Sequence, residues 1–117
     1  MFARLLSRLL SGWQRPQARL ELVLYTKRDC PLCDAMKAEL ARARVRPPFQ
    51  LVEVDVERDA ELLARHGRSI PVLEIAGRAA FKGRLTAAEF ERRYARRAAE
   101  LAAEARAPRV AGGGERG

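Results

Sequence analysis

Residues 20–33 read Leu20-Glu-Leu-Val-Leu-Tyr-Thr-Lys-Arg-Asp-Cys30-Pro-Leu-Cys33, and this stretch decides the fold. Its first seven residues form an apolar run rich in β-forming side chains, which predicts a buried strand. A polar turn follows, and a helix is expected over residues 30–44, because apolar side chains recur there on one face. These side chains are Cys33, Met36, Leu40 and Ala43. Pro31 fits the first turn of that helix, where its missing N–H costs no hydrogen bond.

The rest of the central region predicts two more helices and three more strands. In chain order these are a strand at 49–55, a helix that begins at Asp55 or Asp59 and ends at His66, a strand at 70–75, a strand at 78–82 and a helix from Thr86 to about Ala107. Ala76-Gly77 is a two-residue turn that joins the last two strands into a hairpin.

This order of elements predicts the fold class. A strand–helix–strand unit crosses over with a right hand and pairs its strands in parallel, whereas a hairpin pairs its strands antiparallel. We therefore expect an α/β fold of order β-α-β-α-β-β-α, with a four-stranded mixed sheet and helices on both faces. Residues 19–107 are interpreted as one domain.

Both ends of the chain differ from this domain. Residues 1–18 predict an extra N-terminal amphipathic helix, with apolar side chains on one arc and arginines opposite. The apolar set is Phe2, Leu5, Leu6, Leu9, Leu10 and Trp13. Arg4 and Arg8 interrupt any run long enough to span a bilayer. Three roles stay open for this segment: docking on the domain, contact with an anionic membrane surface, or disorder until a partner binds. Residues 108–117 predict a flexible, glycine-rich tail.

Composition and charge exclude several classes of protein. The chain has 117 residues and a net charge of +8, and half of that excess is the four arginines of residues 1–19. A nucleic-acid domain usually carries its basic patch on its folded face, so nucleic-acid binding is not expected. Two cysteines are too few for a secreted disulfide scaffold, and residues 1–18 lack the continuous apolar stretch of a signal peptide. We expect a cytoplasmic protein, peripheral to the membrane if residues 1–18 bind there.

The motif that carries chemistry is Cys30-Pro31-Leu32-Cys33. Zinc takes four ligands and His66 is the only other strong candidate, so no metal site is expected within one chain. Cys30 would lie at a helix N-terminus, where free N–H groups and the helix dipole lower a thiol pKa. Cys33 would lie one turn further along, on the apolar face of the helix, where burial raises the pKa of a thiol. We expect a dithiol redox pair in which Cys30 is the more acidic and more exposed thiol.

Around this motif the sequence resembles the glutaredoxin branch of the thioredoxin-like fold, in particular the short bacterial glutaredoxin-like proteins. The resemblance covers about residues 20–100 and rests on three short motifs. They are Tyr25-Thr26-Lys27, Cys30-Pro31-Leu32-Cys33 and Ile70-Pro71-Val72. It implies a glutaredoxin-type fold with Cys30 as the nucleophile, Cys33 as the resolving thiol and Pro71 as a cis-proline beside the active site.

The resemblance also implies substrate-binding roles for three residues. Lys27 maps to the basic residue that helps to hold a glutathione carboxylate, and the backbone of Ile70 would pair with a bound peptide or tripeptide. Leu32 stands where glutaredoxins commonly carry Tyr. Gly83-Arg84 has one glycine and a positive charge where the family has two glycines and an acid to hold glutathione. The reductant therefore stays open between glutathione and a thioredoxin-reductase system.

We predict a thiol–disulfide oxidoreductase without a bound cofactor, which uses its Cys-Pro-Leu-Cys dithiol to reduce protein or small-molecule disulfides, among them mixed disulfides that contain glutathione. Two other functions would use the same residues. Two chains together offer four cysteines, enough for one iron–sulfur cluster or another metal in a dimer. A thioredoxin-like adaptor would bind its partners without cysteine chemistry. Disulfide-reductase turnover with a thiol donor discriminates the enzyme from both alternatives.

Overall fold

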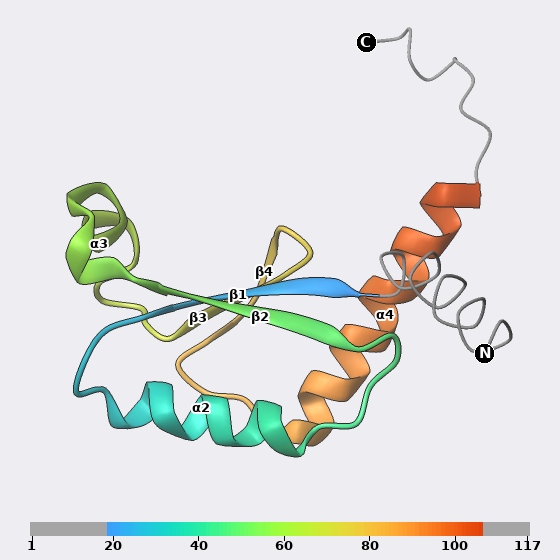
Figure 1. Ribbon diagram of the computed structural model, residues 1–117, viewed down its shortest axis with the longest axis horizontal. Helices are drawn as coiled ribbons and strands as arrows, with labels where there is room; N and C mark the ends of the chain where they lie inside the picture. The colour runs from blue at the N-terminus through green and yellow to red at the C-terminus, as the bar shows by residue number, and fades with distance from the viewer. Residues whose placement is uncertain (1–18, 107–117) are drawn as a thin grey trace, which may run out of the picture.

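The computed structural model describes residues 19–106, which form a four-stranded sheet with three α-helices (Figure 1). In chain order the elements are β1 (Leu20–Thr26), α2 (Pro31–Arg42), β2 (Phe49–Asp55), the 3-10 turn η2 (Val56–Arg58), α3 (Ala60–His66), β3 (Val72–Ile75), β4 (Arg78–Lys82) and α4 (Ala87–Arg106). The predicted order and the thioredoxin-like α/β fold are confirmed. The predictions for residues 1–18 and 108–117, membrane contact included, lie outside the described residues.

The sheet has the strand order β2-β1-β3-β4. β1 pairs with β2 in parallel over its whole length, because α2 carries the chain back across the sheet. β1 pairs with β3 antiparallel, with Tyr25 opposite Val72, and β3 and β4 form the predicted hairpin. At its turn Ala76 and Gly77 have φ of 49° and 83°, as the mirror-image turns of two-residue hairpins require. The C-terminal end of β1 and the N-terminal end of β3 therefore lie side by side at the same end of the sheet's strands.

The hydrophobic core lies between the sheet and the helices α2 and α4, which share one side of it (Figure 1). Alternate residues of β1 point into this core, and Leu22 and Leu24 are fully buried. The other buried members are Met36, Leu40, Leu73, Ile75, Leu85, Phe90 and Tyr94. Each large apolar side chain buried here contributes about 1.5–3 kcal/mol relative to its exposed state. This packing fixes α2, and with it the two cysteines, against the sheet.

The opposite face of the sheet is covered by α3 alone among the described elements, and only at one end (Figure 1). The His66 ring stacks on the Tyr25 ring there, with 4.4 Å between the ring centroids. No residue of α3 is fully buried, and Leu63 is 45% exposed. Helices thus lie on both faces as predicted, but the second face is thinly covered.

The helix after β2 begins at one of its two predicted starts, whereas β3 begins later than predicted. The segment after β2 is divided, because Asp55 caps η2 by accepting from Glu57 N at 2.9 Å and Asp59 caps α3 by accepting from Glu61 N at 2.9 Å. Both alternative starts are therefore real helix caps. β3 begins at Val72, two residues later than expected. Ile70 and Pro71 precede the strand and lie beside the end of β1.

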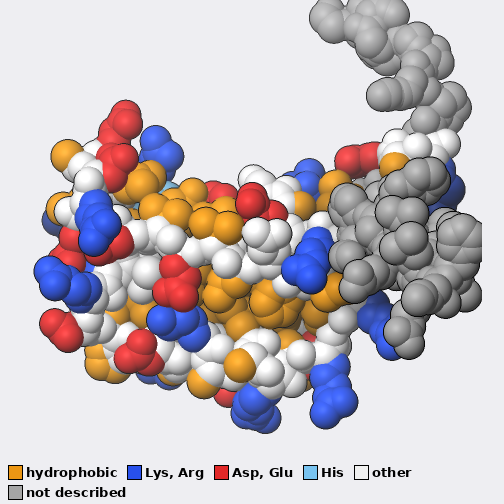
Figure 2. Space-filling model, viewed as in Figure 1, with side chains coloured by type: hydrophobic (Ala, Val, Ile, Leu, Met, Phe, Trp, Pro, Cys, Tyr) orange, Lys and Arg blue, Asp and Glu red, His pale blue; other side chains and the backbone are white. Residues whose placement is uncertain are grey.

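The surface of the domain mixes charges of both signs. Figure 2 shows Lys, Arg, Asp and Glu interspersed over the visible face, with hydrophobic side chains in the seam between β2 and α2. Phe49 and Leu51 of the edge strand β2 are only half-buried beside the core. Among residues 19–106, no helix combines the length and the apolar character that crossing a bilayer requires.

Tyr94 carries a pH-dependent part of the stability. Its ring is fully buried, and its hydroxyl donates a hydrogen bond of 2.6 Å to the carbonyl oxygen of Pro47. Burial raises the pKa of Tyr94 from 10.0 to about 12. The protonated phenol therefore stabilises the fold fully below pH 10.0, and this contribution is lost as the pH rises through about 12.

Urea titrations of the wild type and Tyr94→Phe test this contribution. The free energy of unfolding of the wild type should fall between pH 10.0 and about 12. Tyr94→Phe should be about 1 kcal/mol less stable at neutral pH, since it leaves a carbonyl without its donor. It should also show a smaller fall at high pH. Tyr25 is present in both proteins, so its own titration cancels, and an equal fall in both would contradict the assignment.

Candidate active site: a disulfide at the start of helix α2

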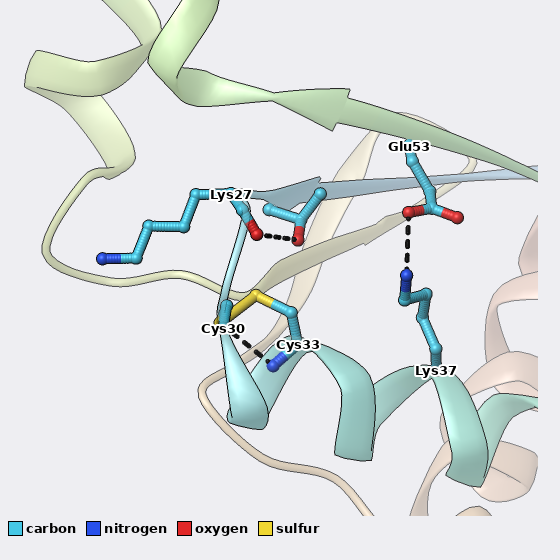
Figure 3. Close-up of a disulfide and its surroundings, with 6 residues drawn as sticks. Lys27, Cys30, Cys33, Lys37 and Glu53 are labelled. Atoms are coloured by element: carbon cyan, nitrogen blue, oxygen red, sulfur yellow. Dashed lines mark hydrogen bonds and ion pairs between the residues drawn. A yellow bond between two sulfur atoms is a disulfide. The ribbon is translucent and has the colours of Figure 1, made fainter.

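The polypeptide between β1 and α2 places Cys30 at the helix N-cap. Asp29 adopts φ of 50°, which turns the chain sharply after the strand, and Cys30 is extended with φ of −120°. Pro31 then begins the helix, as predicted from its fixed φ and missing N–H. Cys30 and Cys33 are joined by a disulfide, with 5.2 Å between their Cα atoms (Figure 3). The chain thus holds the two sulfurs on the first turn of α2.

The two sulfurs have different surroundings. The backbone N–H of Cys33 donates to Cys30 Sγ at 3.1 Å, so the Cys30 sulfur caps the helix. This hydrogen bond and the helix dipole both stabilise negative charge on that sulfur. Cys30 keeps 8% of its surface exposed and Cys33 only 1%, which confirms the predicted order of exposure. An external reactant therefore reaches Cys30 first.

Pro71 lies level with the cysteine loop. The Ile70–Pro71 peptide bond is cis, and Pro71 is buried. Because Tyr25 pairs with Val72, Pro71 comes next to the end of β1, from which the loop to Cys30 departs. The Pro71 carbonyl accepts a hydrogen bond of 2.7 Å from Gly83 N, which ties the β4–α4 loop to the same edge. Ile70 is half-buried beside it.

Lys27 and Leu32 lie in different surface pockets. Lys27 is exposed, and Figure 3 shows its side chain extending away from the disulfide. It lines a pocket together with Thr26, Asp34 and Asp55. Leu32 is 39% exposed and lines a second pocket, between α2 and the β4–α4 loop. The structure therefore does not bring these two predicted substrate-binding residues together in one cavity.

Two carboxylates near the site escaped the sequence analysis. Glu53 on β2 accepts a hydrogen bond of 3.1 Å from Lys37 Nζ (Figure 3). Lys37 lies on α2, one helical turn after Cys33. Glu39 on α2 accepts from Ala87 N, the first residue of α4, at 2.8 Å. The spacing from Cys33 to Lys37 could have placed that lysine on the same side of the helix. No local signal in the sequence points to Glu39, because its partner lies 48 residues away.

Within residues 19–106, no three His, Cys, Asp or Glu side chains gather closely enough to hold an ion. His66 packs against Tyr25, whose pKa is raised by burial and by the nearby Glu74 carboxylate. His66 is thus part of the packing under α3.

Selective alkylation tests the unequal roles of the two sulfurs. With limiting iodoacetamide at about pH 6, reduced protein should be labelled first at Cys30, because Cys30 is the more accessible of the two cysteines and its thiolate is stabilised. Peptide mapping by mass spectrometry locates the label. Protein unfolded in urea serves as the control, in which both cysteines should react at similar rates. Preferential labelling of Cys33 in the folded protein would reverse the roles.

Comparisons with known proteins agree with this geometry. Residues 21–97 match the family model described as "Glrx-like: Glutaredoxin-like domain (DUF836)". A solved structure, the X-ray structure of the Northeast Structural Genomics target protein XcR50 from X. campestris, is 33% identical to this chain with a TM-score of 0.52. The match covers 61% of this chain and 91% of that one. No curated protein matches the sequence.

Proposed function

Because the chain belongs to the glutaredoxin-like domain family (DUF836), we propose that it is a thiol–disulfide oxidoreductase that works through Cys30 and Cys33. The observation that carries the proposal is the Cys30–Cys33 disulfide on the first turn of α2. A redox role for such a pair follows from this arrangement, because the sulfurs are close enough to bond and one of them is reachable.

The reaction transfers two electrons from the dithiol to the substrate. The Cys30 thiolate attacks one sulfur of a substrate disulfide, and the other substrate sulfur leaves as a thiolate and takes up a proton. The Cys33 thiol loses its proton and attacks Cys30 Sγ. This step breaks the mixed disulfide, releases the second substrate thiol and leaves the Cys30–Cys33 disulfide. A thiol reductant then returns the two electrons.

Ile70 and Pro71 are proposed to shape the substrate groove. The loop before β3 ends beside the point from which the chain departs toward Cys30. Pro71 donates no backbone hydrogen bond, and its carbonyl is taken by Gly83. Ile70 therefore offers the free backbone groups with which an extended substrate would pair. In this proposal Lys27, which lines a separate pocket, contacts a part of the substrate that lies away from the reacting sulfur.

A reductase assay tests the proposed function. The full chain is given a neutral disulfide substrate and, in separate reactions, glutathione with its reductase or thioredoxin with its reductase. Turnover with either system supports the proposal and identifies the reductant. If neither system gives turnover, and mild oxidation yields no intramolecular Cys30–Cys33 bond by mass spectrometry, the proposal fails.

A further inference from the structure

A surface pocket lies beside the cysteine motif and is lined in part by Leu32. It has a volume of about 280 Å³ and opens between α2 and the β4–α4 loop. Its apolar part includes Leu32, Met36 and Leu85, and its charged groups are Glu39, Arg84 and Glu89. We call it the Glu39 pocket. Because Leu32 lies between the two cysteines in the sequence and lines this pocket, we expect a group attached to a sulfur bound to Cys30 to reach it.

Glu39 occupies the N-terminus of α4, which borders this pocket. Glu39 Oε1 accepts from Ala87 N at 2.8 Å, and Thr86 Oγ1 accepts from Glu89 N at 3.1 Å. Free N–H groups at a helix N-terminus and the positive end of the helix dipole attract carboxylates. Here that attraction is satisfied by a carboxylate of the chain itself. Glu39 Oε2 is held in addition by Arg42 at 3.3 Å.

The remaining charges of the pocket repel a further carboxylate. Among the lining residues, Glu39 and Glu89 contribute two negative charges and Arg84 contributes one positive charge, while Arg42 pairs with Glu39 from outside the lining. A carboxylate that entered would meet both acids at a helix end whose dipole is already compensated. An uncharged group would meet the apolar wall, and an ammonium group would be attracted.

We propose that the Glu39 pocket selects disulfides whose group beside the reacting sulfur is uncharged or cationic, and that Glu39 is the residue that sets this preference. The inference rests on the proposed function and names its substrate class. Polypeptide disulfides flanked by apolar or basic side chains fit this class. Glutathione, which carries two carboxylates, fits it poorly.

Three small disulfides of equal chain length test the inference on the full protein. They are 2-hydroxyethyl disulfide, which is neutral, cystamine, which carries two ammonium groups, and 3,3′-dithiodipropionate, which carries two carboxylates. The rate at which each oxidises the reduced protein is measured at low salt. The readout is the rate with the dicarboxylate divided by the rate with the neutral disulfide. Intrinsic differences in reactivity cancel when this ratio is compared between variants.

Glu39→Gln removes the charge and keeps an oxygen that can accept from Ala87. It should raise the ratio about threefold to tenfold, and 0.5 M KCl should reduce this gain, because salt screens exposed charges. Glu89→Gln leaves the contact with Ala87 intact and should change the ratio in the same direction. Glu91→Gln is the matched control, since Glu91 accepts from Arg44 N at 2.8 Å and does not line the pocket.

The outcomes separate this inference from the proposed function. A ratio that rises in both pocket variants and stays unchanged in Glu91→Gln supports the inference. Equal ratios in all three variants and the wild type overturn it, while oxidation by the neutral disulfide still supports the redox function. If the wild type forms no Cys30–Cys33 bond with any of the three disulfides, the proposed function itself fails. Circular dichroism verifies that each variant is folded.

Discussion

Replacing Cys30 by Ser is expected to abolish disulfide reduction, with a loss on the order of a thousandfold or more. Cys30 is the sulfur that keeps access to solvent and accepts the N–H of Cys33, so no other group can begin the attack. A serine hydroxyl at the same place is not ionised at neutral pH and does not attack disulfides. Turnover of 2-hydroxyethyl disulfide with a coupled thiol donor measures the loss.

Cys33→Ser is the matched variant and should fail at a different step. Cys30 can still attack, but no thiol follows to break the mixed disulfide. Mass spectrometry should therefore show one substrate half bound to Cys30 in Cys33→Ser and none in Cys30→Ser. Both substitutions are nearly isosteric, and thermal unfolding should verify that the folds survive. Turnover retained in Cys30→Ser and lost in Cys33→Ser would mean that the two cysteines exchange roles.

Phe90→Ala is expected to lower the free energy of unfolding by about 3–5 kcal/mol, a large share of the stability of a small domain. The Phe90 side chain has no exposed surface. Its ring centroid lies 5.4 Å from that of Tyr94 and 5.8 Å from that of Phe49, the latter in an edge-on arrangement. Phe90 thus joins α4 to β2, and alanine would leave a cavity between them.

Urea denaturation followed by far-UV circular dichroism measures this loss. Leu63→Ala is the control, because Leu63 is a large apolar side chain that is 45% exposed on α3. Its effect should stay within about 0.5 kcal/mol, as for most surface substitutions. Similar losses in both variants would contradict the assignment of the core to the α2 and α4 side of the sheet.

The core and the chemistry are linked through α2. Met36 and Leu40 bury one face of this helix in the core, while Cys30 and Cys33 occupy its first turn. The position of the sulfurs relative to Pro71 thus depends on packing that lies one to two turns away. A variant that loosens the core without unfolding the domain should therefore also slow the reaction with a substrate disulfide.

Local patterns in the sequence were sufficient for most of the fold. The apolar run of β1, the proline after Cys30 and the hairpin turn at Ala76-Gly77 each act over a few residues, and the structure confirms all three. The strand-to-helix position of the cysteines follows from the same local signals. The start of β3 was placed too early, because Ile70 and Pro71 continue an apolar run that the sheet does not pair.

Tertiary structure alone decided how the surroundings of the dithiol are arranged. Lys27 and Leu32 are five residues apart, yet they line different pockets, because the loop turns at Asp29 before the helix begins. Glu39 reaches the N-terminus of α4 only because the core packs α2 beside α4, across 48 residues of chain. Sequence periodicity reports which face of an element is buried. Periodicity does not report which distant element packs against that face, and the hydrogen-bond partners of Glu39 and Glu53 depend on that packing.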